Sequence, residues 1–409
     1  MINKILFILF IFFLSTQLGK HFFFQFSYIS GIRVDYLAPT IYLLDIIIFI
    51  LAIVNLKIVL KFFKKKFFIA IFLLSIINMF FANSLPLVFY GFVKIIEFFI
   101  VFSLGQKMLT ILGNKIILIS LLVMTFFQFL LVFFQLLLRH SVNGFFYYFG
   151  ERFINLSIPG IAKISLFGQE LLRPYGTFSH PNSLAGFFLL LLFYVLTEKK
   201  FSKFLILKNI FLLFSSLIIF LTFSKISIVS YLLLTIIYYI LSIKKCRFCL
   251  ISRIFTLVVV GLIFLIGKGD PLSLQKRIEL VGSSLSIIFK HPIVGVGVSN
   301  YLLSQAEYVS KFPYFINQPV HNIFLLFLSE WGIFFGGYFI YLFFRQSGRV
   351  VIERPYIFLV IITTGIFDHY WLTSNQNFIL LAFILSFIIK SQVRNVPDRS
   401  KEKEKLKVR

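Results

Sequence analysis

Acidic side chains are scarce in this chain. Only 15 of its 409 residues are Asp or Glu, charged residues of both signs amount to 13%, and 59% of the residues are hydrophobic. A water-soluble globular domain carries about 25% charged residues. The composition, with a mean hydropathy of +0.97, therefore excludes a large soluble domain and predicts a protein that lies mostly within a membrane.

Cysteine is almost absent, since the chain has only Cys246 and Cys249. Their C-x-x-C spacing would suit a metal or redox site, but zinc needs four ligands and the sequence holds no second pair. We interpret the two residues as incidental thiols. No D-x-D pair of carboxylates occurs in the predicted outer segments either, and we expect neither a metal ion nor another cofactor.

Apolar runs close to the length that crosses about 30 Å of hydrocarbon recur along the whole chain. We expect the first run to stay as a span, because the residues after it make a poor signal-peptide cleavage site. The predicted fold class is an all-α, polytopic integral membrane protein with about twelve transmembrane helices, at residues 4–18, 40–60, 67–82, 87–106, 116–138, 183–197, 205–222, 226–243, 254–267, 321–343, 356–367 and 377–390.

The net charge of +25 is an orientation signal. If the N-terminus is cytoplasmic and the spans alternate, basic residues in cytoplasmic segments outnumber those in outer segments about twofold, as the positive-inside rule requires. Both termini are then cytoplasmic. The basic surplus indicates attraction to anionic membrane lipids, and we expect no nucleic acid among the partners.

The same topology places all six histidines and the two longest loops, residues 139–182 and 268–320, outside. In the second loop, apolar residues recur at three- and four-residue spacing from Ile278 to Ile288, which predicts an amphipathic helix on the bilayer surface. We divide the chain into N-terminal helices and loops, 1–170, a membrane region, 171–390, that includes loop 268–320, and a charged cytoplasmic tail, 391–409.

Polar residues on the predicted outer face fall into five groups. They are Arg173 to Ser183, which includes His180 and Asn182; Thr222 to Lys225; Arg277 with residues 291–297; His321 with Asn322; and Asp368 to Trp371. Three inward-running spans begin beside the first, second and fourth groups. The N-terminus of each span carries a partial positive charge and free N–H groups, so the outer face suits a phosphate ester.

Each group also has an ordinary structural interpretation. Asn182 or Ser183 is a natural N-cap for the helix that follows. A lone lysine at the end of a span, such as Lys225, usually extends to the interface. The G-x-G of Gly295 and Gly297 has no strand before it and no Lys after it, so it predicts a turn more than a phosphate loop.

The fourth and fifth groups carry the same ambiguity. A single histidine at a helix start, such as His321, is more often structural than catalytic. Glu330 lies about 180° around the helix from it and is not expected to orient it. Tyr370 and Trp371 are ordinary interfacial anchors, whereas Asp368 is less ordinary.

Several stretches resemble the O-antigen ligase and polymerase family of bacterial glycan transferases. They are RPYGTFSHPNSLAGF, TFSK, RIEL followed by HPIVGVGVSNY, and HNIFLLFLSEWG, all between Arg173 and Gly332. The most specific feature is HPN followed by HNxxL at this separation. The N-terminal stretch TQLGKHFFFQFSYISGIRVDYLAPTIYLLD is similar to a bacterial subset of the same family.

The resemblance implies a C-type glycosyltransferase (GT-C) fold in the cytoplasmic membrane, and a polyprenyl-diphosphate-linked glycan donor used on the outer face without a metal ion. By position, His321 resembles the essential histidine, and Arg173 and Arg277 the diphosphate-binding arginines. Lys225 stands where the family usually has Arg, which keeps the charge but loses the bidentate fork. Support is expected from His180, Asn182, Asn322 and Asp368.

The function expected is therefore inverting glycan transfer to an acceptor hydroxyl on a glycan, lipid or protein. Polymerase, ligase and protein O-glycosyltransferase all stay open. The main alternative is a transporter or flippase of lipid-linked sugars, which would keep polar groups near the membrane midplane. Lys94 and Glu97 are the clear candidates for such groups, but at i,i+3 they are also placed to pair with each other. A purely structural membrane protein is the third option.

Overall fold

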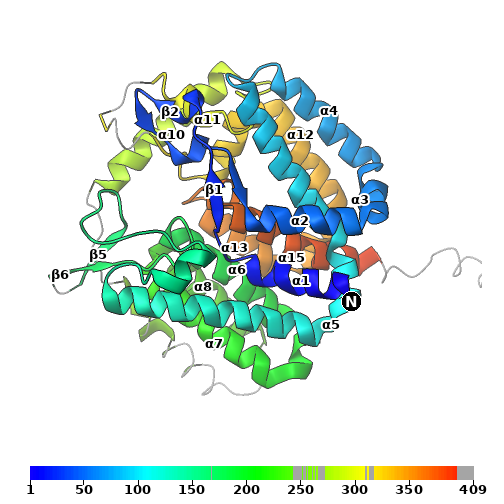
Figure 1. The fold of residues 1–409 in the computed structure, drawn as a ribbon, viewed down its shortest axis with the longest axis vertical. Coiled ribbons are helices and arrows are strands. Elements are labelled where there is room, and N and C mark those ends of the chain that lie inside the picture. Colours follow the sequence, from blue (N-terminus) through cyan, green and yellow to red (C-terminus); the bar gives the residue numbers. More distant parts are fainter. Residues whose placement is uncertain are drawn as a thin grey trace, which may run out of the picture.

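The computed structural model describes residues 1–166, 168–242, 251, 255, 257–259, 261–262, 264–265, 272–308, 311–312 and 317–393. Helices dominate these residues, as predicted (Figure 1). Cys246, Cys249, most of the predicted span 254–267 and most of the tail 391–409 lie outside them.

The described helices follow the predicted apolar runs. In chain order they are α1 (Ile2–Phe13), α2 (Leu43–Val54), α3 (Leu56–Phe63), α4 (Lys66–Met79), α5 (Leu85–Leu138), α6 (Pro181–Thr197), α7 (Leu205–Leu221), α8 (Lys225–Ser242), α10 (Ser273–Lys290), α11 (Tyr301–Gln305), α12 (Ile323–Glu353), α13 (Pro355–Gly365), α14 (Tyr370–Thr373) and α15 (Asn375–Val393). Short 3-10 turns are η1 (Gln25–Ser27), η2 (Asp35–Leu37), η3 (Gly144–Phe149) and η4 (Lys199–Phe204).

Three helical segments of the described chain are long and apolar enough to cross a membrane: Leu85–Leu138, Lys199–Leu221 and Ile323–Arg345. The pair α2 and α3 would make a fourth, and six further helices are apolar but shorter. This helical content agrees with an integral membrane protein. The total of twelve spans stays a prediction.

The predicted spans 87–106 and 116–138 both lie in α5, and the predicted span 40–60 contains a bend. Gly113, with a φ of 68°, interrupts α5 between the predicted spans 87–106 and 116–138. The predicted span 40–60 is bent, because α2 and α3 meet at an angle of 91°. At this bend the Asn55 side-chain amide donates to the Leu51 carbonyl and to Asn3 Oδ1, which ends α2.

The all-α prediction needs a correction outside the apolar runs, where short antiparallel strands form. β1 (Gly19–His21) pairs with β4 (Thr40–Tyr42), β2 (Tyr28–Ile29) with β3 (Ile32–Arg33), and β5 (Lys163–Leu166) with β6 (Gln169–Leu172). Ser30 and Gly31 join β2 to β3 with φ values of 49° and 78°. Two positive φ angles match the right-handed twist of a two-residue hairpin.

Helix α6 lies at the centre of the helical packing. All its residues from Ser183 to Val195 are buried, because the sequence there is apolar on every side. It packs against α7, α8, α13 and α15. The position of its first turn is therefore fixed from all directions.

The predicted amphipathic helix of the second outer loop is α10, at the top of the view in Figure 1. Its buried face consists of Leu280, Ser284, Ile287 and Ile288 and packs toward α12, where Ser284 bonds to Ser329. On other sides of α10, Ile278 and Leu285 are exposed. The helix is confirmed, and its place on a bilayer surface stays a prediction.

Helix α12 is broken at Gly332, with φ 70° and ψ 168°. The loop of residues 292–298 fills the break. The N–H groups of Val296 and Gly297 donate to the carbonyls of Ser329 and Glu330, and the Ile333 N–H donates to the Pro292 carbonyl. The G-x-G of this loop is thus a turn, as predicted, and its glycines have positive φ.

Candidate active site

The N-cap of α6 is His180, whereas the sequence predicted Asn182 or Ser183 as the cap. His180 Nδ1 accepts the backbone N–H of Asn182 at 3.1 Å. Pro181 occupies the first helical position, where proline is favoured, so the cap falls one residue before it. An Nδ1 that accepts belongs to a neutral imidazole. Accordingly, burial and, to a smaller extent, the positive charge of Arg173 lower the pKa of His180 to about 3.

Because His180 caps the helix, the Asn182 side chain is available for other bonds. Its Oδ1 accepts from Arg173 Nη2 at 2.6 Å, and its Nδ2 donates to Asp368 Oδ2 at 2.9 Å. One amide therefore joins a guanidinium to a carboxylate. Burial lowers the pKa of Arg173 to about 10, and at neutral pH the guanidinium stays charged.

Asp368 connects this amide to His321. The Nδ1 atom of His321 lies 3.6 Å from Asp368 Oδ1, and both side chains are largely buried. Burial opposes ionisation of Asp368, but the neighbouring imidazoles of His321, His369 and His180 outweigh burial and lower the pKa of this carboxyl. Asp368 is thus the carboxylate that faces Nδ1 of His321. As predicted, Glu330 does not pair with His321, because it accepts from the backbone N–H of Ser299 instead.

His369 completes the cluster. Its ring centroid lies 5.1 Å from that of His321, and its Nδ1 lies 2.7 Å from Thr373 Oγ1. The Tyr36 ring of the N-terminal segment meets it edge-on at 5.6 Å. Burial lowers the pKa of His369 to about 3. Three of the six histidines therefore meet at one site.

Two further predicted residues anchor the turn that carries Asp368. Arg277 on α10 donates from Nη1 to the Phe367 carbonyl at 3.4 Å, and Asn322 donates from Nδ2 to the Ile366 carbonyl at 3.1 Å. Asn322 Oδ1 also caps α12 by accepting two of its first N–H groups. The starts of α6 and α12 thus converge on one turn.

Lys225 stands at the edge of this cluster. It is the exposed first residue of α8. Thr222 lies three residues before Lys225, and its carbonyl accepts a hydrogen bond from Arg173 Nε at 2.9 Å. In the part of the chain that the structure describes, no acidic side chain forms an ion pair with Lys225. Its exposed ammonium is therefore not compensated by a described acidic side chain.

Two glutamines of α5 hold the segment that leads into α6. Gln128 and Gln135 are buried and seven residues apart, which places them on one helix face. Gln135 Oε1 accepts the N–H groups of Tyr175 and Gly176, and Gln128 Nε2 donates to Thr177 Oγ1. This backbone cannot shift without breaking buried hydrogen bonds.

The cluster also has the composition of a metal site. His321, Asp368 and His369 each offer a ligand atom, and these atoms lie within 4.8 Å of one another. Two histidines and one carboxylate can bind zinc or iron(II). Asp368, however, already accepts two hydrogen bonds. Its Oδ2 accepts from the Asn182 side chain, and its Oδ1 accepts from the backbone N–H of His369. An ion would compete with these hydrogen bonds.

The polar pair expected of a transporter forms its own group of ion pairs. Lys94 forms ion pairs with Glu97, as its spacing predicts, and with Asp45. Asn375 on α15 donates to the same Asp45. The lysine charge is therefore compensated within the protein.

These features describe a membrane protein with a cluster of basic and histidine side chains around one carboxylate. Residues 210–342 match the family model described as O-antigen ligase, which confirms the resemblance to the O-antigen ligase and polymerase family. A comparison with curated proteins gives no match. The family match supports a membrane glycan transferase of the O-antigen ligase or polymerase type, with a lipid-linked glycan donor and an acceptor.

The matched segment contains Lys225, Arg277 and His321, whereas Arg173, with His180 and Asn182, precedes it, and Asp368 follows it. The hydrogen bonds and the ion pair described above join Arg173 and Asp368, and through them Asn182, to residues within the matched segment.

His369 and Tyr36 were not predicted as site residues. His369 directly follows Asp368 in the sequence, and this adjacency was a usable signal. Tyr36 belongs to the N-terminal stretch, and its packing on His369 connects it to the site.

Proposed function

We propose that this protein transfers a glycan from a polyprenyl-diphosphate carrier to an acceptor hydroxyl on the outer face of the cytoplasmic membrane, with inversion and without a metal ion. The observation that carries the proposal is the chain of contacts from Arg173 through Asn182 and Asp368 to His321. It couples a cation that can bind phosphate to a histidine that can accept a proton.

In this mechanism, Nε2 of His321 accepts the proton of the acceptor hydroxyl, while Asp368 faces Nδ1 and stabilises the imidazolium that forms. The acceptor oxygen attacks the anomeric carbon from the side opposite the diphosphate. The bond between that carbon and the diphosphate oxygen breaks, and the electron pair leaves with the polyprenyl diphosphate.

Arg173, Lys225 and Arg277 stabilise the departing diphosphate. His180 supports the reaction through its cap on α6, which leaves Asn182 to bridge Arg173 and Asp368. Asn322 supports it by holding the turn at Ile366.

The test incubates the purified protein with a polyprenyl-diphosphate glycan, alone and with candidate lipid and protein acceptors. A growing glycan indicates a polymerase, and intact transfer to another acceptor indicates a ligase or a protein O-glycosyltransferase. Transfer should persist in EDTA. Loss of transfer that zinc or iron(II) restores would contradict metal independence, and no transfer with any acceptor would contradict the proposed function.

A further inference from the structure

A large cavity lies beside the site, on the side of the N-terminal segment. Its volume is about 860 Å³, and its walls come from residues 17–42, residues 147–153, the first half of α5, and α12. Tyr36 and Thr373, which both contact His369, are part of its lining. Among the described residues, the three proposed diphosphate-binding cations do not line it. The cavity thus reaches the histidine cluster from a different direction.

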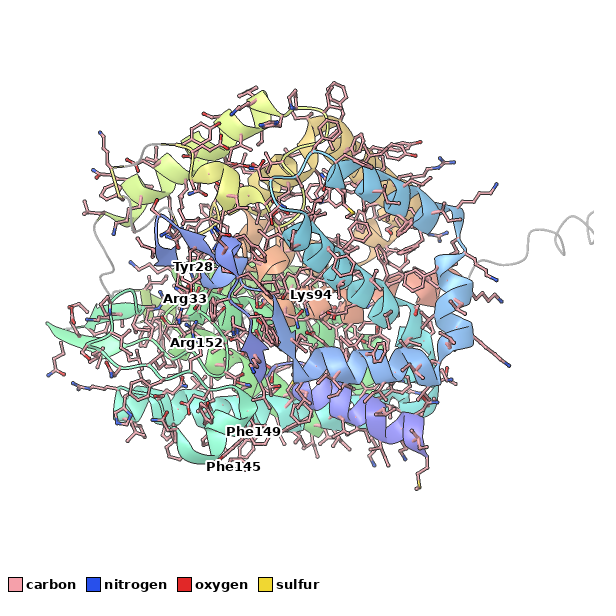
Figure 2. All side chains as sticks on the ribbon, turned by 45° about the horizontal axis from the view of Figure 1, so that its top comes forward. Tyr28, Arg33, Lys94, Phe145, Phe149 and Arg152 are labelled. Atoms are coloured by element: carbon pink, nitrogen blue, oxygen red, sulfur yellow. The ribbon has the colours of Figure 1, made fainter. Side chains whose placement is uncertain are left out.

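One part of the cavity lining carries excess positive charge. Asp35 lies between two arginines, 3.2 Å from Arg33 and 3.6 Å from Arg152. Figure 2 shows these two arginines close together, with Lys94 on α5 farther along. The side chains of Arg33 and Arg152 are 60% and 49% exposed, so both can bind a ligand. Two guanidinium groups on one carboxylate leave one positive charge uncompensated.

The other charged residues of the lining are engaged within the protein. Glu151 accepts from Gln135 and from the N–H groups of Val142 and Asn143. Lys94 is paired with Asp45 and Glu97, and buried Glu330 accepts the Ser299 N–H. The arginine pair is therefore the strongest recognition element for an anion in the cavity.

Another part of the lining is apolar and aromatic. It is formed by Phe67, Phe98 and Phe99 from α4 and α5, and by Phe327, Trp331 and Phe339 from α12. Helices α5 and α12 are two of those long enough to cross a membrane. These side chains offer an apolar surface to a hydrocarbon chain.

We propose that this cavity binds the acceptor of the transfer reaction, and that the acceptor is an anionic amphiphile. Its acidic group binds Arg33 and Arg152, its apolar chain lies along the aromatic side chains of α5 and α12, and its hydroxyl passes Tyr36 to reach His321. The inference rests on the proposed function, and it gives the N-terminal segment a role in acceptor selection.

Binding can be measured directly in nanodiscs. The chain has two tryptophans, so Trp371→Phe leaves Trp331 as a reporter inside the cavity. The probes are dodecyl glucuronide and dodecyl glucoside, each brominated on the chain to quench tryptophan, and brominated dodecyl phosphate. We expect the glucuronide or the phosphate to quench Trp331 at a concentration at least tenfold lower than the glucoside does. The stronger of the two identifies the acidic group as carboxylate or phosphate.

Substitution of the arginines tests their part. The Arg33→Gln/Arg152→Gln variant should lose the preference for the acidic probes, and Arg139→Gln/Lys163→Gln, which removes two positive charges outside the cavity lining, should keep it. Absence of quenching, or equal quenching by acidic and neutral probes in the parent protein, would overturn the inference.

The binding assay is independent of catalysis. His321→Ala should bind the probes as the parent protein does, so failure of the proposed function would leave this result intact. In the transfer reaction, Arg33→Gln/Arg152→Gln should raise the KM for acceptor and leave the KM for donor unchanged. An unchanged acceptor KM, with His321→Ala inactive, would contradict the acceptor cavity alone.

Discussion

The polar cluster around Asp368 and the break in α12 at Gly332 use different parts of the chain to hold their shape. In the cluster, side chains bond to side chains, as Asn182 does to Arg173 and Asp368. At the break, backbone bonds between the loop of residues 292–298 and α12 replace the missing helical hydrogen bonds, and the Asn78 side chain adds bonds to the same loop. A substitution in the cluster should therefore change the chemistry, and one at the break should change the stability.

The largest effect is expected for His321→Ala. Loss of a general base lowers a rate by about 10² to 10⁴, and the backbone of the cluster stays in place because Asn322 still caps α12. Transfer from a polyprenyl-diphosphate glycan, measured with the melting temperature, checks this. His291→Ala, an exposed histidine in the other region, serves as control and should stay active. Substantial residual transfer by His321→Ala would argue against the role.

Unlike His321→Ala, Gly332→Ala should reduce the stability of the fold. The φ and ψ of Gly332 lie in a region that only glycine populates readily, and a Cβ would sit 2.6 Å from the carbonyl of Ile293. The backbone strain alone costs about 1–3 kcal/mol. Thermal unfolding in detergent measures it. Gly337→Ala on the same helix meets no atom within 4 Å and should be neutral or slightly stabilising. Similar melting temperatures for the two variants would contradict the difference between the regions.

Asp368→Asn should lower kcat by about 100-fold, the effect of a catalytic group misplaced by about 1 Å. The amide keeps one oxygen to accept from Asn182, but it no longer stabilises the imidazolium of His321. The KM for the lipid-linked donor should change little, because Arg173 keeps its bond to Thr222. Steady-state kinetics separate the two parameters. A rise in donor KM at constant kcat would assign Asp368 to donor binding instead.

The sequence predicts those parts of the structure that depend on local pattern. Apolar runs located nearly all described helices, and the G-x-G indicated a turn. The helix starts predicted Arg173, Lys225 and His321 on one side, since three polar groups precede inward-running spans. These features follow from hydrophobicity, charge and turn chemistry within short windows.

The partners within the site could not be predicted, because they come from distant segments. Asn182 looked like an N-cap, and it bridges instead to Asp368, 186 residues away. Gln128 and Gln135 stood as isolated polar residues in an apolar run, and only the fold shows that they bond the segment before α6. The break at Gly332 likewise depends on a loop that folds back onto α12.

A smaller effect is expected at Lys225, at the edge of the cluster. Lys225→Ala should raise the donor KM by roughly tenfold, as loss of one charge-assisted contact does. Lys225→Arg keeps the charge and should be tolerated. Kinetics with the lipid-linked donor compare the two variants. Equal damage from both would show that the exposed side chain acts through packing and not through charge.

The smallest effect concerns the pH dependence of stability. Burial lowers the pKa of His180 and His369 to about 3, whereas in the unfolded chain a histidine titrates near 6.5. Between these values the unfolded state binds more protons, so the free energy of unfolding falls as the pH falls. The slope is at most about 1.4 kcal/mol per pH unit for each histidine. The lowered pKa of Asp368 adds stability that is complete above about pH 3.8 and is therefore constant between pH 7 and pH 5.

His369→Gln removes one of the two titrating groups while keeping a polar side chain beside Thr373. Its melting temperature should fall less steeply than that of the unmodified protein between pH 7 and pH 5, and His180→Gln/His369→Gln should fall least. The same slope in all three proteins would mean that the buried imidazoles bind protons in the folded state. The cluster would then be open to water, unlike the hydrogen-bonded break at Gly332.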